Sequence, residues 1–338
     1  MVTAKTVETT PAAPDLLLQV RDLTVRFPVK RGGMFSPKKY LTAVDGISFD
    51  VPRGRTLAIV GESGSGKTTA ALAVARLVAA QGGSVKLGDD DFLDLEGEAL
   101  RRARTRVQFI FQDPYASLNP RWKVARIIEE PARAQGKATD GMAEKLLEQV
   151  GLAASDAGKY PHEFSGGQRQ RICVARALAS EPRLIVADEP TSALDVSVQA
   201  QVLNLMSDLR ERLGLTYLLI SHDLTVVQHM SDRIGVLYLG RLVEESAADF
   251  LFETPRHPYT QMLIEAAPRL DGFGREAVLP EGEIPDPTDP PPGCPYHPRC
   301  PFAVDRCRTE LPALRPFDGG RVACHRAEEI AAGEAAAA

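Results

Sequence analysis

The sequence predicts an α/β protein with a largely parallel β-sheet, an inserted helical subdomain and a small C-terminal extension. Three observations support this fold class. Short apolar runs alternate with segments of helical composition over most of the chain, which is typical of parallel α/β folds. Helical segments interrupt that alternation between about 95 and 170. From residue 271 onward, proline density rises sharply and helices become improbable.

The individual elements follow from local patterns. Residues 16–27 alternate between apolar and polar side chains, as a half-buried strand does. Further strands are predicted at 43–51, 56–60, 107–111, 184–189, 216–221 and 233–239. Helices are predicted at 68–79, 165–180 and 196–213. The domain boundaries that follow are a disordered leader at 1–15, a main domain at 16–270 and a Pro/Cys-rich extension at 271–338, with a loop at 28–40.

Composition excludes several classes of protein. The net charge is -5 and the pI is about 5.8, which argues against nucleic acid as a partner. No apolar stretch approaches the ~20 residues of a membrane-spanning helix. The first fifteen residues lack the apolar core of a signal peptide. We therefore expect a cytoplasmic protein that reaches a membrane only through partners.

A phosphate-binding loop is predicted where the strand at 56–60 meets the helix at 68–79. The segment 61–68 reads GESGSGKT and fits G-x-x-x-x-G-K-[ST]. Its glycines let backbone N–H groups approach phosphate, Lys67 can reach the β- and γ-phosphates, and the Thr68 hydroxyl can bind Mg²⁺. A chance match would occur in roughly 1% of chains of this length. The predicted nucleotide-binding residues here are Gly61, Glu62, Ser63, Gly64, Ser65, Gly66, Lys67, Thr68 and Thr69.

Two acidic residues end the apolar strand at 184–189. Ligands of open α/β sheets bind at the carboxyl ends of strands, so Asp188 is placed to hold Mg²⁺. Glu189 is placed to orient or deprotonate an attacking water. An acidic strand end can also be a solvated terminus, but the phosphate loop upstream favours the catalytic interpretation.

The segment Ser165-Gly166-Gly167-Gln168 is the motif that distinguishes this chain from other phosphate-loop proteins. A serine hydroxyl, two glycines and a helix N-terminus could form a second anion site. The alternative is a helix that is simply capped by Ser165. With this motif, the chain resembles the ABC ATPase family over residues 16 to about 245, and the resemblance implies an antiparallel β segment at the N-terminus.

The resemblance also implies roles for single residues. The segment 165–168 would cap the γ-phosphate of a nucleotide held by the opposite subunit of a dimer. Gln112 would contact Mg²⁺ and water and sense the transport subunit, and Asp195 would lie in the loop that crosses the dimer interface. His222 would contact the γ-phosphate. Phe27 is the first candidate for stacking on adenine and Tyr40 is the second.

Other segments resemble the ATPase subunits of dipeptide and oligopeptide importers. These segments are AVDGISF (43–49), VGESGSGKTT (60–69), FQDPYASLNPR (111–121) and HPYTQML (257–263). The loop at 28–40 resembles the second of two paired ATPases. The resemblance implies ATP and Mg²⁺ as cofactors, a related ATPase as heterodimer partner, two membrane permease subunits, and indirectly an extracytoplasmic substrate-binding protein. The chain would then lie peripherally on the cytoplasmic face of the membrane.

Three alternative functions follow from the same motifs. A nickel or other-solute importer would carry a similar ATPase. A soluble ABC ATPase acting on ribosomes or DNA usually has two cassettes, coiled-coil insertions or a basic surface, none of which is evident in this sequence. An exporter half is often fused to spanning helices, and this sequence contains no stretch long enough for one.

The extension contains four cysteines, spaced C-x5-C-x6-C-x16-C: Cys294, Cys300, Cys307 and Cys324. Cytosolic proteins rarely use such a group for disulfides, so metal binding is the favoured interpretation. Four thiolates suit a [4Fe–4S] cluster, which the resemblance also implies, or a zinc site. Unliganded thiols are the remaining alternative.

Overall fold

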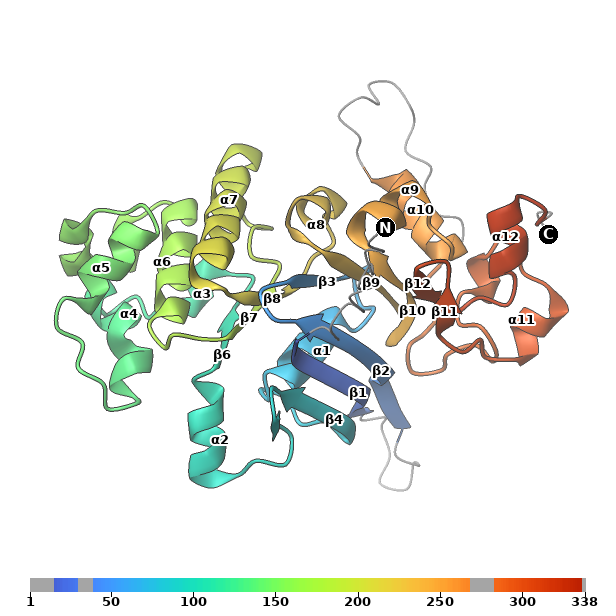
Figure 1. Ribbon diagram of the computed structural model, residues 1–338, viewed down its shortest axis with the longest axis horizontal. Coiled ribbons are helices and arrows are strands. Elements are labelled where there is room, and N and C mark those ends of the chain that lie inside the picture. The colour runs from blue at the N-terminus through green and yellow to red at the C-terminus, as the bar shows by residue number, and fades with distance from the viewer. Residues whose placement is uncertain (1–14, 30–38, 268–282, 336–338) are drawn as a thin grey trace, which may run out of the picture.

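An eight-stranded sheet runs through the middle of the protein (Figure 1). The computed structural model describes residues 15–29, 39–267 and 283–335. The strands of this sheet are β3 Thr56–Val60, β6 Val107–Ile110, β7 Leu184–Asp188, β8 Thr216–Ile220, β9 Arg233–Tyr238, β10 Arg241–Ala247, β11 Arg315–Phe317 and β12 Gly320–Val322. Their order is β11-β12-β10-β9-β3-β8-β7-β6. The pairs from β9 to β6 are parallel and the pairs from β11 to β9 are antiparallel, which confirms a mixed, largely parallel sheet.

A second, antiparallel sheet is formed mainly by the N-terminal part of the chain. Its strands are β1 Leu16–Val29, β2 Lys39–Pro52, β4 Gly82–Leu87 and β5 Asp90–Asp91, in the order β2-β1-β4-β5. This arrangement confirms the expected antiparallel β segment. The periodicity of the sequence predicted β1 and β2 but not β4 or β5, because those two strands are short and rich in Gly and Asp.

Helices flank the two sheets. They are α1 Lys67–Val74, α2 Gly97–Arg104, α3 Pro114–Ser117, α4 Val124–Arg133, α5 Met142–Gln149, α6 Gly166–Leu178, α7 Val196–Leu213, α8 Leu224–Met230, α9 Ala248–Glu253, α10 Pro258–Ala266, α11 Asp305–Thr309 and α12 Ala327–Ala332. Helices α4, α5 and α6 pack on one another at one end of the molecule, whereas α1 contacts strands of both sheets (Figure 1). The range expected for the helical subdomain, about 95–170, also contains β6, which belongs to the main sheet, and α6 continues to Leu178.

The apolar run of β3 is continuous because each of its faces is buried in a different core. Ala58 and Val60 belong to the core shared with the helices, while Leu57 and Ile59 belong to the core around α1 and the second sheet. Alternate side chains of a strand point to opposite faces of the sheet. A strand covered on both faces therefore needs an apolar residue at every position.

The C-terminal extension is attached to the edge of the main sheet. Strand β12 pairs with β10, where Glu244 lies opposite Val322. Cys294, Tyr296 and Cys307 are buried in the core that also contains the helical residues. The extension therefore shares its hydrophobic core with the main domain.

Some sequence predictions fall outside the described residues. The leader lies there up to residue 14, as do residues 30–38 of the loop predicted at 28–40, and residues 271–282 of the extension. Among the described residues, no helix is both long and apolar enough to cross a membrane.

Candidate nucleotide-binding site

The predicted phosphate loop connects β3 to α1, and its glycines are required by close backbone contacts. Gly61 has φ 150°, and a Cβ there would lie 2.2 Å from the carbonyl oxygen of Leu237. Gly66 has φ 103°, and a Cβ there would lie 2.1 Å from the carbonyl oxygen of Ala43. Any larger residue would displace the loop from its neighbours.

Lys67 is held inside this loop by the backbone. Its Nζ donates hydrogen bonds to the carbonyl oxygens of Gly61 at 2.7 Å and Glu62 at 2.8 Å. Burial lowers the pKa of Lys67, and the nearby carboxylates of Glu189 and Asp188 oppose that shift. The ammonium group of Lys67 is therefore held at the loop, where a bound phosphate would lie.

Thr68 and Asp188 meet across the end of the main sheet. The Thr68 hydroxyl donates to Asp188 Oδ1 at 3.1 Å. Burial raises the pKa of Asp188, while the hydrogen bond from Thr68 opposes this shift. A hydroxyl and a carboxylate are hard oxygen ligands, so this pair fits the requirements of Mg²⁺.

Glu189 lies between two of the other predicted residues. Its Oε2 accepts from Gln112 Nε2 at 2.7 Å, and its Oε1 lies 2.8 Å from His222 Nδ1. Glu189 has φ 45°, a left-handed conformation that is uncommon for a residue other than glycine. Such strain is frequent at functional sites, where it aims a side chain in a fixed direction.

These groups surround one open cavity of about 670 Å³. Phe27 lines this cavity, and Pro287 of the extension also contributes. Tyr40 is not among the described residues that line the cavity, so Phe27 is the better placed of the two adenine-stacking candidates. The predicted residues that line it are Phe27, Ser63, Gly64, Gly66, Lys67, Thr68, Thr69, Gln112, Glu189 and His222. Gly61, Glu62, Ser65 and Asp188 contact these residues from behind.

The segment 165–168 does not line this cavity. Ser165 accepts a hydrogen bond from the Gln168 N–H at 3.4 Å, and Gln168 Oε1 accepts from the Ser165 N–H at 3.0 Å. This reciprocal pair caps the exposed N-terminus of α6. A Cβ at Gly167 would lie 2.2 Å from Val198, so α6 and α7 approach closely there. Asp195 is exposed at the start of α7, also away from the cavity.

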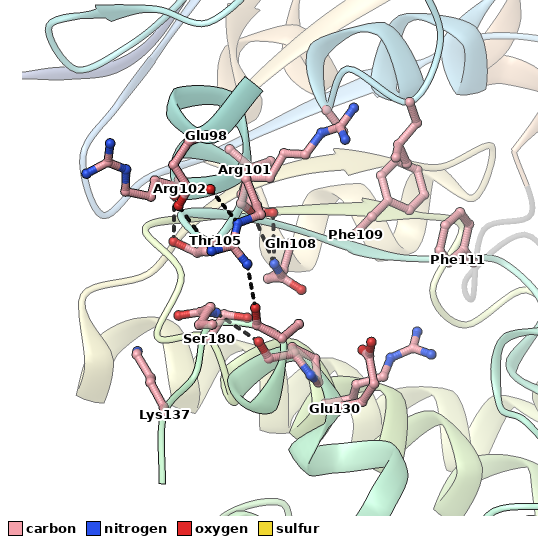
Figure 2. A pocket seen from close by; sticks show the side chains of 18 residues that line it. Glu98, Arg101, Arg102, Thr105, Gln108, Phe109, Phe111, Glu130, Lys137 and Ser180 are labelled. Atoms are coloured by element: carbon pink, nitrogen blue, oxygen red, sulfur yellow. Dashed lines mark hydrogen bonds and ion pairs between the residues drawn. The ribbon is translucent and has the colours of Figure 1, made fainter. Parts of the chain in front are cut away.

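A second cavity, of about 700 Å³, lies between the main sheet and the helical region (Figure 2). Phe109 and Phe111 form its aromatic part, with ring centroids 4.5 Å apart. Arg101 crosses from α2 to donate to the Ala134 carbonyl at 2.9 Å. Five basic and two acidic side chains line it, Arg101, Arg102, Arg104, Lys137 and Arg176 against Glu98 and Glu130. Phe111, which lines this second cavity, directly precedes Gln112 in the chain.

Two further residues reach the phosphate loop from the C-terminal part of the chain. Tyr259 Oη accepts a hydrogen bond from the Glu62 N–H at 2.8 Å. Arg299 forms two hydrogen bonds with the Glu62 carboxylate, at 2.7 and 2.9 Å. In the sequence, the segment 257–263 stands out only by its family resemblance, and Arg299 belongs to no recognised motif. No local pattern indicates a contact between residues 237 positions apart.

The prediction of an iron–sulfur cluster is wrong. Among the described residues, no group of three or more His, Cys, Asp or Glu side chains could hold a metal ion, which also removes the zinc alternative. Burial raises the pKa of Cys294 and Cys300 to about 11 and that of Cys324 to about 12. Metal ligation requires thiolates, whereas burial disfavours the thiolate form of Cys294, Cys300 and Cys324. Together with Cys307 they line a small apolar cavity and form no disulfide. Spacing in the sequence indicated proximity of the cysteines but could not indicate their environment.

Comparisons with known proteins place the chain in a family. Residues 44–192 match the family described as ABC transporter, and residues 243–307 match the one described as oligopeptide/dipeptide transporter, C-terminal region. A probable peptide ABC transporter ATP-binding protein of Sinorhizobium fredii is 49% identical, over 92% of this chain and 90% of that protein. The dipeptide transport ATP-binding protein DppF of Escherichia coli is 46% identical, over 93% and 95%.

A solved structure supports the same assignment. A dimeric ATP-binding cassette in a post-hydrolysis state, bound to ADP and Pi, has a TM-score of 0.60 and 27% identity, over 68% of this chain and 98% of its own. The chain therefore belongs to the ABC transporter family of ATP-binding proteins. Its relatives are ATP-binding proteins of peptide transporters, which confirms the branch expected from the segments quoted above.

The hydrogen bond that positions Tyr259 requires a neutral His257, so the free energy of unfolding should depend on pH. His257 Nδ1 accepts the Tyr259 N–H at 3.1 Å at the start of α10, and burial lowers the pKa of His257 from 6.5 to about 3. Between these values the unfolded chain binds a proton that the folded chain does not, so stability falls as pH falls through this window. We expect a loss of about 1.4 kcal/mol per pH unit well inside the window. Urea unfolding of the wild type at pH 7.5, 6 and 5 measures it.

His257→Asn keeps a helix-capping side chain that does not titrate. Its free energy of unfolding should depend less on pH than that of the wild type. The matched control is His162→Asn at an exposed position, which should retain the wild-type slope. Equal slopes in all three proteins would contradict the assignment.

Proposed function

We propose that this chain is the ATP-hydrolysing subunit of an ABC importer for dipeptides or oligopeptides. The observation that carries the proposal is the cavity that brings together Lys67, the Thr68–Asp188 pair, and Glu189 between Gln112 and His222. The peptide substrate is proposed from the relatives, whose names describe peptide and dipeptide transport.

The phosphate loop would hold the triphosphate of ATP. Backbone N–H groups of the loop and the ammonium of Lys67 would donate hydrogen bonds to the β- and γ-phosphates. Thr68, Asp188 and Gln112 would hold Mg²⁺, which supplies electrostatic neutralisation of the phosphate oxygens when bound. Phe27 offers an aromatic face to the adenine ring at the edge of the same cavity.

Glu189 would accept a proton from the attacking water. Each of its oxygens has one hydrogen-bonding neighbour and a further lone pair, so the carboxylate can still bind water while Gln112 and His222 hold its orientation. A water held against the γ-phosphate by this carboxylate would be oriented for in-line attack.

We further propose that the site is completed by a second protomer. Ser165, Gln168 and Asp195 are exposed, and the capped turn at 165–168 lies outside the cavity of its own chain. A helix N-terminus with two glycines is suited to bind phosphate, so the turn of one protomer would cover the γ-phosphate held by another. The partner would be a second, related ABC ATPase in a heterodimer.

The second cavity, lined by Arg102, Phe109 and Phe111 among others, is the proposed contact with the membrane permease subunits, and we call it the docking groove. Its aromatic part suits an apolar helix face, and its excess of basic side chains favours an acidic partner segment. Phe111 of the groove directly precedes Gln112 in the chain. Movement of a permease segment in the groove would therefore act on Glu189 through its hydrogen bond with Gln112. The chain would then act peripherally at the cytoplasmic face of the membrane, and an extracytoplasmic binding protein would deliver peptide to the permease.

Replacing the proposed base should abolish turnover without preventing ATP binding. Glu189→Gln keeps a side chain of the same size but cannot take a proton, so we expect kcat to fall by about 10²–10⁴-fold. Steady-state phosphate release and equilibrium binding of ATP measure the two properties. Glu211→Gln, an exposed glutamate on α7, is the matched control. Hydrolysis at the wild-type rate in Glu189→Gln would refute the assigned role.

Reversing a charge in the docking groove should uncouple the ATPase from its permease. Arg102 lines the groove and is exposed. In Arg102→Glu, we expect the ATPase rate of the isolated chain to remain and co-purification with the permease to fall, by about five- to tenfold for one unfavourable charge contact. Arg212→Glu on α7 makes the same charge change outside the groove. Equal co-purification of the two variants would exclude the groove as the docking site.

A further inference from the structure

We propose that Arg299 is a positioning residue for the phosphate loop, through which the C-terminal extension controls ATP binding. This inference rests on the nucleotide site proposed above and adds a residue that lies outside the nucleotide-binding motifs. Arg299 does not line the nucleotide cavity among the residues described, so it would act through Glu62.

The contact between Arg299 and Glu62 has the geometry of a specific ion pair. Arg299 Nη1 lies 2.7 Å from Glu62 Oε2 and Nη2 lies 2.9 Å from Oε1, which is a parallel, two-point contact. Only an arginine presents two donors in that fixed geometry, so the contact constrains direction as well as distance.

The surroundings of this pair distinguish it from a surface ion pair. The Arg299 side chain is 3% exposed and that of Glu62 is 21% exposed. The Arg299 guanidinium lies 5.7 Å from the centre of the Tyr296 ring and 6.0 Å from that of Tyr238. Solvent therefore screens the contact weakly, and loss of either partner would leave a poorly solvated charge.

Arg299 is itself held by the fold of the extension. The backbone N–H of Arg299 donates to the Tyr296 carbonyl at 3.0 Å, and the backbone N–H of His297 donates to the Cys294 carbonyl at 3.0 Å. The Cys294 N–H in turn donates to the Cys307 carbonyl at 2.8 Å. The guanidinium position thus depends on a turn that is hydrogen-bonded to α11 of the extension.

Glu62 is held at three points, and one of them is shared with Lys67. Its side chain is bound by Arg299, its N–H donates to Tyr259 Oη, and its carbonyl accepts from Lys67 Nζ at 2.8 Å. Releasing the side chain would allow this residue to rotate. The carbonyl that orients the lysine would then move with it.

A simpler interpretation is that the ion pair only fastens the extension to the main sheet. The two interpretations differ in what a second mutation does. If Arg299 acts on nucleotide through Glu62, removing Arg299 should have no further effect on ATP binding once the Glu62 side chain is absent. If it only stabilises the extension, Arg299→Ala should lower the free energy of unfolding and leave the affinity for ATP unchanged.

A double-mutant cycle tests this difference. The proteins are wild type, Arg299→Ala, Glu62→Ala and the double variant, and the measurements are the Kd of ATP and the KM and kcat of hydrolysis. We expect Arg299→Ala to weaken ATP binding by about tenfold, within the range for residues that act on a ligand from a distance. We expect the double variant to bind ATP as weakly as Glu62→Ala does and no more weakly. Additive effects, or unchanged ATP affinity in Arg299→Ala, would overturn the proposal.

Three controls complete the experiment. Arg306→Ala removes an exposed ion pair with Glu310 in the same extension and should leave ATP binding unchanged. Arg299→Lys keeps the charge but not the two-point contact, so it should fold if Arg299→Ala does not, and should retain an intermediate ATP affinity. Full affinity in a folded Arg299→Lys would also contradict the positioning role. If the wild type itself fails to bind ATP, the proposed nucleotide site is refuted rather than the role of Arg299.

Discussion

The confinement of the phosphate loop is the constraint on which the rest of the site depends. The loop leaves the main sheet at β3 and is enclosed by parts of the chain that are far apart in sequence. Gly66 touches β2 of the antiparallel sheet, Gly61 touches β9, and the Gly240 N–H donates to the Ser65 carbonyl at 2.8 Å. Because two separate segments, β2 and the region of β9 with its following turn, fix the loop, small changes in either of them are transmitted to the residues that would meet phosphate.

The candidate catalytic groups are arranged around that fixed loop by the parallel order of the main sheet. Strands β3, β8 and β7 are parallel neighbours, so the segments that follow them all begin at the same edge of the sheet. This order brings Lys67, Glu189 and His222 together although about 155 positions separate the first from the last. The strained conformation of Glu189 then aims its carboxylate toward both Gln112 and His222.

The sequence predicted those parts of the protein whose signal is local. The apolar run of β3 and the glycine pattern of the loop each carry their own information, since burial on two faces and close backbone contact restrict residue type directly. Strands β11 and β12 were not predicted, because three-residue strands have no periodicity. They exist only because β12 pairs with β10 and β11 pairs with β12. The contacts of Tyr259 and Arg299 with Glu62 were missed for the same reason, since they exist only once distant segments have packed together.

The extension shows how composition can mislead when environment is unknown. Four cysteines in a proline-rich tail are compatible with a metal site, but burial raises the pKa of Cys294, Cys300 and Cys324, which disfavours the thiolates that a metal needs. Cys294 and Cys307 belong to the hydrophobic core that the extension shares with the main domain. Packing in this core places Arg299 beside the phosphate loop. The extension is thus part of the structure around the nucleotide cavity, to which it also contributes Pro287.

The central proposal is that two protomers share each nucleotide. It is tested by placing Lys67→Ala in this chain, so that only its partner ATPase holds nucleotide, and adding an ATP analogue with a photoreactive group on the γ-phosphate. After irradiation, mass spectrometry locates the label. Labelling of residues 165–168 of this chain, dependent on the partner, is the result expected. If those residues stay unlabelled while the partner is loaded with the analogue, the shared site is contradicted.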